Sequence, residues 1–161
     1  MTATTRATVK RLADKEILIT RSFRAPARLV FEAWTNPELV RQWWAPASRG
    51  VTMLVCDAEI KVGGAYRYVL GGSDGQQFAF SGRYLELTPP DRVVYTQVFE
   101  AFPDGEATVT VTFEERDGVT VVTGHELYPS KEALDGALQT GMEDGMNDTY
   151  EQLDKLLITL S

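Results

Sequence analysis

The stretch SKEALDGALQTGMEDGMNDTYEQLDKLL, residues 130 to 157, decides the fold. Small and apolar side chains recur in it at i, i+3 and i+4 spacing, which predicts one amphipathic helix from Ser130 nearly to the C-terminus. The apolar stripe consists of Leu134, Ala137, Leu138, Gly141, Met142, Gly145, Met146, Thr149, Leu153, Leu156 and Leu157. Because a helix with one apolar face must bury it against another layer, the remaining chain is expected to supply a sheet.

Strand patterns fill most of the chain before that helix. EILITRSF, residues 16–23, is rich in β-branched and apolar residues, and six further strand patterns lie between Val51 and Leu127. Pro26 and the Asn36-Pro37 pair each open a short helix after the first strand. This order predicts an α+β helix-grip fold, a curved antiparallel β-sheet wrapped around a long C-terminal helix. One domain is expected over residues 14–161, after a flexible N-terminal tail of residues 1–13.

Composition excludes several classes of function. The 161 residues carry 16 Lys and Arg against 23 Asp and Glu, a net charge of −7. Nucleic acids and anionic membrane surfaces need a basic footprint, so neither is an expected partner. No run of eighteen apolar residues is present, so no membrane span is expected. Cys56 is the only cysteine, which rules out an intrachain disulfide and fits a cytoplasmic location.

Several segments together resemble a known superfamily. They are EILITRSFRAPARLVFEAWTNPELVRQWWAP (16–46), GGAYRYV (63–69), FSGRYLELTPPDRVVYT (80–96), TVTFEERDGVTVVT (110–123) and YPSKEALDGALQTGMEDGMNDTYEQLDKLL (128–157). The pattern resembles the SRPBCC (START/Bet v allergen-like) superfamily, and within it the family named for the C-terminal domain of the activator of heat-shock-protein-90 ATPase. The resemblance extends from about Asp14 to Leu157.

The resemblance implies a fold that often holds small apolar ligands between sheet and helix, and some members are cyclases or hydratases. Two segments depart from the family pattern: Arg24-Ala25-Pro26 replaces acidic-Ala-Pro, and Trp43-Trp44-Ala45-Pro46 replaces Trp-Trp-Gly-Pro. No residues remain for the co-chaperone's separate N-terminal domain, so a chaperone is not the favoured partner.

The last predicted hairpin assigns an inward position to a carboxylate. Its turn is Asp117-Gly118. The register that follows pairs Arg116 with Val119, Phe113 with Val122, Val111 with Gly124 and Val109 with Glu126. Because Val109, Val111 and Phe113 form the apolar face, Glu126 is expected to point inward, where desolvation raises its pKa. Glu126 is therefore a candidate general acid or ligand anchor. Alternatively it reaches solvent at the strand end, or pairs with an arginine such as Arg83.

Other residues are expected to line a cavity beside Glu126. Glycines and methionines on the helix stripe leave room and form an adaptable wall, although plain core packing explains them as well. A bulge near Gly82 would reconcile the faces of FAFSGRYLEL and place its phenylalanines inward. The candidate ligand-binding residues are Trp43, Trp44, Tyr66, Tyr68, Phe78, Phe80, Val111, Phe113, Gly124, Glu126, Gly141, Met142, Gly145 and Met146.

The three tryptophans are assigned to different places. Trp34 shares a helical face with Val30 and Ala33 and is expected in the core. Trp43 and Trp44 are adjacent and cannot both face one side of a helix. One of them is expected to plug the end of the core while the other lies near the cavity entrance or packs under Pro46.

Two functional hypotheses remain from the sequence. The first is a binding protein for a small apolar or aromatic, lipid- or polyketide-like molecule, in a closed cavity of several hundred cubic ångströms; a variant of it is a cyclase-like enzyme using Glu126. The second is a protein-interaction module, with docking to a basic partner or a homodimer. His125 is the only histidine, and it is expected on the other face of the strand from Glu126. No catalytic triad, zinc site or cofactor is therefore expected.

Overall fold

The computed structural model describes residues 6–140 and 142–160. Within them, eight antiparallel strands form one sheet in the order β1-β2-β8-β7-β6-β5-β4-β3. The strands are β1 (Thr8–Ala13), β2 (Glu16–Phe23), β3 (Thr52–Ala58), β4 (Ala65–Gly71), β5 (Gln77–Thr88), β6 (Arg92–Phe99), β7 (Ala107–Arg116) and β8 (Val119–Leu127). The helices are α1 (Ala27–Thr35), α2 (Pro37–Val40), α3 (Lys131–Gln139) and α4 (Met142–Leu160), with short 3-10 turns η1 (Ala47–Arg49) and η2 (Pro103–Gly105).

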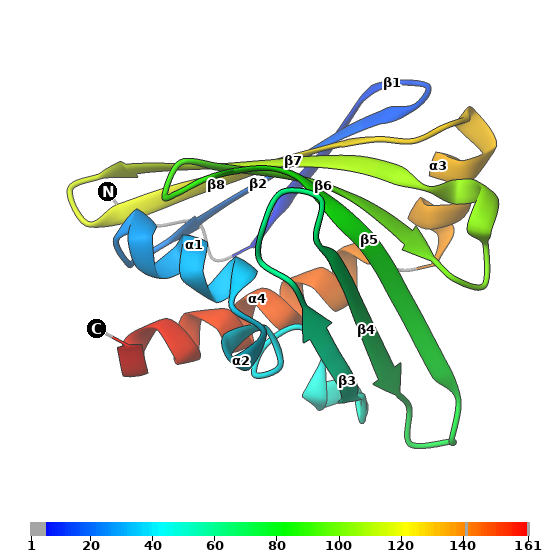
Figure 1. The fold of residues 1–161 in the computed structure, drawn as a ribbon, viewed down its shortest axis with the longest axis horizontal. Coiled ribbons are helices and arrows are strands. Elements are labelled where there is room, and N and C mark those ends of the chain that lie inside the picture. The colour runs from blue at the N-terminus through cyan, green and yellow to red at the C-terminus, as the bar shows by residue number, and fades with distance from the viewer. Residues whose placement is uncertain (1–5, 141, 161) are drawn as a thin grey trace.

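The sheet is strongly curved, and α1, α2 and α4 lie on its concave side (Figure 1). The strands β3, β4 and β5 bend down from the rest of the sheet toward α2 and α4, while α3 lies at the opposite end from the β7–β8 hairpin. This arrangement confirms the predicted α+β helix-grip fold.

The first strand was not predicted from the sequence. Residues assigned to the flexible tail form β1, in which Thr8 lies opposite Thr20 and Ala13 opposite Glu16. The backbone N–H of Ala7 also donates to Asn147 Oδ1 on α4, at 2.7 Å. The prediction failed because TVKRLA is a mostly exposed edge strand without an alternating apolar face.

The C-terminal stretch is two helices rather than the one predicted. The first, α3, ends at Gln139 and is followed by Thr140, whose Oγ1 donates to the carbonyl of Ala137 at 2.6 Å. The second, α4, begins at Met142. Threonine has low intrinsic helix propensity, and its hydroxyl competes for backbone carbonyls, which favours a helix end at this position.

The expected bulge in β5 is present but lies beyond Gly82. The register between β5 and β6 shifts between Tyr84 and Glu86. Gly82 has another role, because a Cβ there would lie 1.8 Å from the carbonyl oxygen of Thr96 and 2.8 Å from the ring of Tyr66. The missing side chain therefore lets the Tyr66 ring pack against the strand.

Both short helices begin where the sequence indicates. Asn36 caps α2, since its side chain accepts a hydrogen bond from the backbone N–H of Glu38 at 3.0 Å. The first N–H of α1, that of Ala27, donates instead to Glu115 Oε1 on β7 at 2.8 Å. A carboxylate at this end complements the positive end of the helix dipole and fixes α1 to the hairpin.

Two apolar clusters hold the helices against the sheet. The larger includes Phe23, Trp43, Phe113 and Leu153 and lies between the sheet, α1 and α4. The smaller one consists of Ala7, Ile17, Ile19 and Leu134, with Val9, Tyr128, Leu138, Met142, Met146 and Tyr150 packed against it. It joins β2 to α3 and the first part of α4.

Candidate functional site

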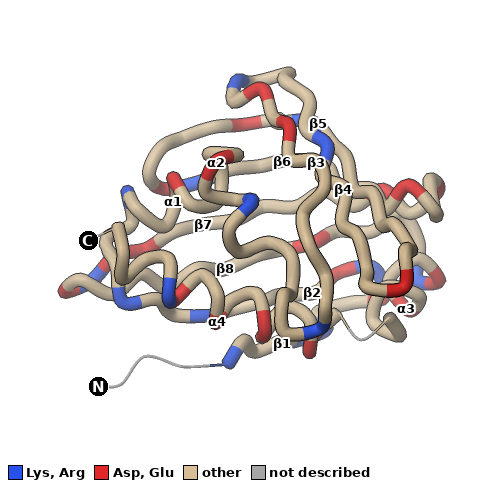
Figure 2. The backbone as a smooth tube through the Cα atoms, turned by 90° about the horizontal axis from the view of Figure 1, so that it is seen from below, with Lys and Arg blue, Asp and Glu red and all other residues tan. Residues whose placement is uncertain are grey.

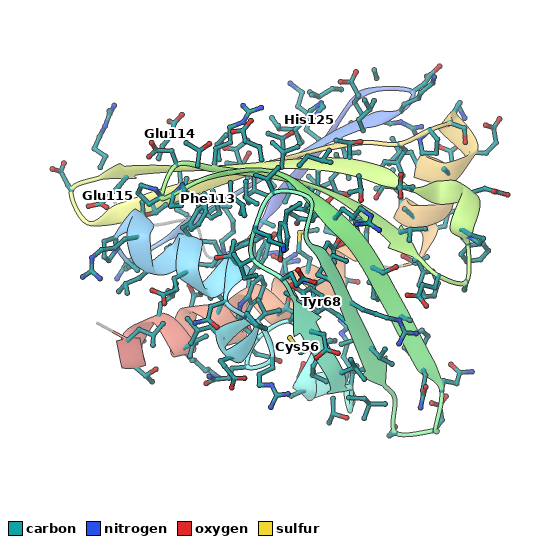
Figure 3. All side chains as sticks on the ribbon, viewed as in Figure 1. Cys56, Tyr68, Phe113, Glu114, Glu115 and His125 are labelled. Atoms are coloured by element: carbon teal, nitrogen blue, oxygen red, sulfur yellow. The ribbon has the colours of Figure 1, made fainter. Side chains whose placement is uncertain are left out.

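The β7–β8 hairpin has the predicted register throughout. Arg116 lies opposite Val119, and Val109 lies opposite Glu126. Figure 3 shows the two faces of this hairpin, with His125 on the outer side of the sheet and Phe113 on the helix side. Because successive residues on a strand alternate, Glu126 points to the helix side.

Glu126 borders a small cavity between the sheet and helices α1 and α4. The cavity has a volume of about 40 Å³. Each water-sized group needs roughly 10–15 Å³ of such space, so the cavity has room for about three of them. Its lining residues are Ile19, Arg21, Trp34, Tyr95, Val109, Val111, Val122, Gly124, Glu126 and Tyr150. Gly124 contributes to the free space, because a Cβ there would meet nothing nearer than Ile19 at 4.0 Å.

Burial raises the pKa of Glu126 above its usual value, since the ionised carboxylate loses its hydration inside the fold. A hydrogen bond from the Tyr128 hydroxyl to Glu126 Oε1, at 2.7 Å, and the charge of His125 oppose this shift in pKa. His125 itself pairs with Glu16, at 2.8 Å, on the outer face.

Arg83 is not the counter-ion of Glu126, so the pairing of these two residues that the sequence suggested as an alternative is wrong. Arg83 is exposed, and its Nη1 donates to the carbonyl of Gly63 at 3.2 Å. It lies on the outer face of β5, where it lines an open groove.

The cavity contains a basic residue that sequence reasoning missed. Arg21 is 3% exposed and donates to both carboxylate oxygens of Asp154 on α4, at 2.7 Å each. Its guanidinium also lies 4.6 Å from the centre of the Phe23 ring. A signal was present, because Arg21 shares the inward alternation of Ile17, Ile19 and Phe23 on β2.

A second cavity of about 20 Å³ lies beneath β4, β5 and β6. Its lining residues are Trp34, Thr35, Trp44, Tyr66, Tyr68, Tyr84, Val93, Tyr95 and Gln97. Trp34 and Tyr95 line both cavities. These two side chains therefore form a partition between them.

The structure resolves the roles of the adjacent tryptophans. Trp43 is 2% exposed, and its Nε1–H donates to the carbonyl of Ala33 at 2.8 Å, so it plugs the core. Trp44 lines the second cavity, with ring centres 5.0 Å from Tyr68 and 5.2 Å from Phe80.

The other predicted site residues lie in different parts of the structure. Val111, Gly124 and Glu126 line the first cavity, whereas Tyr66 and Tyr68 line the second together with Trp44. Packing residues that line neither cavity are Phe78 and Phe80, which contact Phe99; Phe113, which contacts Phe31 and Trp34; and Met142 and Met146, which pack against the smaller cluster. An added Cβ at Gly145 would meet no atom within 4 Å, and Gly141 lies outside the described residues.

Between the sheet and helices α1 and α4, the cavity that the described residues form at Glu126 is about 40 Å³, much smaller than the several hundred cubic ångströms expected. Bulky rings from three elements fill that space: Trp34 from α1, Tyr95 from β6 and Tyr150 from α4. The Trp34 ring centre lies 5.8 Å from that of Tyr150. Sequence reasoning missed Tyr95 and Tyr150 because nothing local to them indicates that they meet.

Charged side chains do not suggest another kind of site. Lys and Arg are interspersed with Asp and Glu along the chain (Figure 2). Within residues 6–140 and 142–160, no three His, Cys, Asp or Glu side chains lie close enough to hold a metal ion. In the same residues, no helix is long and apolar enough to cross a membrane.

Residues 24–158 match the family described as Activator of Hsp90 ATPase homolog 1-like protein. The chain belongs to this family. The match confirms the family resemblance of the sequence, and the fold that Activator of Hsp90 ATPase homolog 1-like proteins share often binds hydrophobic ligands.

Solved structures of several bacterial proteins have the same fold. A Rhodobacter sphaeroides protein is 26% identical, with a TM-score of 0.87 over 96% of this chain and 99% of that one. A Mycobacterium smegmatis protein is 29% identical, with a TM-score of 0.81 over 97% of each chain. A Staphylococcus epidermidis protein is 30% identical, with a TM-score of 0.80 over 96% and 95% of the two chains. No curated protein matches the chain.

Proposed function

We propose that this protein binds a small, largely apolar or aromatic molecule between the sheet and helices α1 and α4, with Glu126 as its polar anchor. The observation that carries this proposal is an inward carboxyl group at the edge of an internal cavity. A buried carboxylate costs free energy unless it is paired. Perturbed ionisable groups of this kind cluster at functional sites.

The surroundings of Glu126 support binding rather than a purely structural role. Its hydrogen bond to Tyr128 occupies Oε1. The side chain is half-buried and borders the cavity. An apolar wall with one convergent polar group is the usual composition of a small-molecule site.

A ligand of more than a few atoms needs additional space. The partition of Trp34 and Tyr95 separates the two cavities, so displacement of these rings would join them. The combined site would extend from Glu126 to Trp44 and Gln97. We therefore expect binding to be accompanied by movement of α1, which carries Trp34.

We also propose a cytoplasmic location. Cys56 is a buried free thiol that donates to the carbonyl of Pro37 at 3.3 Å. Burial raises its pKa to about 11, so the thiol stays protonated and unreactive. A reducing compartment is compatible with such a thiol.

Native mass spectrometry of the protein purified from its own host tests the function directly. Wild type is expected to carry an additional non-covalent mass that disappears under denaturing conditions. Glu126→Gln should retain less of it, whereas Glu16→Gln, which removes a carboxylate from the outer face, should retain it fully. Wild type without bound mass, or equal retention by Glu126→Gln, would count against the proposal.

A further inference from the structure

The charges around the first cavity do not balance when Glu126 is ionised. Arg21 and Asp154 neutralise each other through two hydrogen bonds of 2.7 Å. Glu126 then contributes one further negative charge, and the hydrogen-bond partner of its carboxylate in the described part of the chain is the neutral Tyr128 hydroxyl. A ligand group of charge +1 would complete the balance.

The groups that face Glu126 from neighbouring elements do not supply this charge. They are Tyr66 on β4, Tyr95 on β6, Tyr128 after β8, Tyr150 on α4, Arg21 on β2 and, across the sheet, His125. Burial raises the pKa of each of these phenols, so all four are neutral near pH 7. His125 is held by Glu16 on the outer face.

The cavity walls also suit a cation. Three aromatic side chains, Trp34, Tyr95 and Tyr150, border the space beside Glu126. Aromatic rings attract cations through their negative faces, and the attraction is stronger where water is excluded. The net charge of −7 on the whole chain adds a field that favours the approach of cations.

We propose that the ligand presents an alkylammonium group to Glu126, between the rings of Trp34, Tyr95 and Tyr150. This inference rests on the proposed function and specifies the ligand's polar end. The ammonium donates to the carboxylate, while the apolar body of the ligand extends toward the second cavity.

The size of the cavity determines which small molecules are suitable as probes of the site. Room for about three water-sized groups matches ethylammonium, which has three heavy atoms. Ethanol has the same number of heavy atoms and no charge, so it is a matched neutral probe. Even at the ceiling of ligand efficiency, a three-atom ligand binds with a Kd of about 1 mM.

The experiment titrates each probe into the full chain at constant ionic strength and follows amide and indole shifts by NMR. At pH 8, ethylammonium is expected to bind wild type at least tenfold more tightly than ethanol. Glu126→Gln should bring the two affinities within about twofold of each other. Glu16→Gln, which also removes one negative charge but on the outer face, should leave the tenfold preference unchanged.

The pH dependence of probe affinity is a second, independent test of the ammonium assignment. A cation needs the ionised carboxylate, so ethylammonium affinity should rise from pH 5 to pH 8, over which an alkylammonium stays protonated. A neutral ligand that accepts a hydrogen bond from the protonated acid would show the opposite trend.

Equal affinity for the two probes in wild type, an unchanged preference in Glu126→Gln, or binding of neither probe would overturn the ammonium assignment. Tighter binding of ethanol would also overturn it while leaving the proposed small-molecule site intact. A host-derived neutral ligand found by mass spectrometry would have the same consequence.

Discussion

Two neighbouring residues on β8 show how the side of the sheet determines chemistry. His125 is half-exposed on the outer face and pairs with Glu16. Glu126 is the next residue, yet it faces the cavity and has Tyr128 as its hydrogen-bond partner. Burial raises the pKa of this inward carboxyl group above its usual value.

The raised pKa of Glu126 predicts a pH-dependent stability. A carboxyl group whose pKa is higher in the folded than in the unfolded state favours folding below its unfolded pKa, and this contribution is lost as pH rises through the folded pKa. The free energy of unfolding of wild type should therefore fall relative to that of Glu126→Gln as pH rises from 4.5 upward. Urea unfolding of both proteins at several pH values measures this difference. A constant difference would contradict the burial of the carboxyl group.

The two adjacent tryptophans should respond differently to the same substitution. Trp43→Phe removes buried ring volume and the hydrogen bond to Ala33, and should cost about 2–3 kcal/mol. Trp44→Phe changes a ring beside a cavity and should cost less than about 1 kcal/mol. Chemical denaturation of the two variants checks the ranking, and equal losses would refute the assigned roles.

At the scale of elements, ion pairing links β2 to α4. Arg21 is buried, and the Asp154 side chain is 38% exposed. Removal of one partner from a buried pair leaves a charge without compensation in the interior. This link fixes α4 over the strand that borders the first cavity.

Asp154→Asn should therefore destabilise the protein more than loss of a surface pair. We expect about 2–3 kcal/mol, below the ~3–5 kcal/mol of a fully buried pair because solvent screens the exposed part of Asp154. The matched control is Glu100→Gln, which breaks the exposed Arg67–Glu100 pair and should cost less than about 1 kcal/mol. Similar losses in thermal or urea unfolding would contradict the structural role of the buried pair.

The sequence predicts elements and local register better than the site. The Asp117-Gly118 turn and the alternation of β7 were enough to place Glu126 inward. The Arg21–Asp154 pair joins residues 133 positions apart, so no local pattern could predict it. The cavity volume could not be predicted from the sequence either, because it depends on how the rings of Trp34 and Tyr150 pack.

At the scale of the whole molecule, two small cavities lie between the sheet and the helices. The two cavities of about 40 and 20 Å³ share Trp34 and Tyr95 as a partition. Whether the protein accepts a drug-sized ligand therefore depends on the position of these rings. The curved sheet carries Tyr95 on β6, and α1 carries Trp34.

Trp34→Ala should join the two cavities. The substitution is expected to cost about 3–5 kcal/mol in stability. It should also let the chain bind the fluorescent probe N-phenyl-1-naphthylamine several-fold more tightly than wild type. Trp43→Ala is the control, since it removes a buried ring that lines neither cavity. Equal probe binding by both variants would show that general loosening, rather than a joined cavity, admits the probe.

The pKa of Glu126 decides the proposed site, because burial of its carboxyl group outweighs the hydrogen bond from Tyr128 and the charge of His125. An NMR titration of its side-chain carbon in ligand-free protein, assigned by comparison with Glu126→Gln, tests this claim most directly. We expect a pKa above the usual 4.5. Titration at or below that value would contradict it, because the carboxylate would then be either hydrated or already paired.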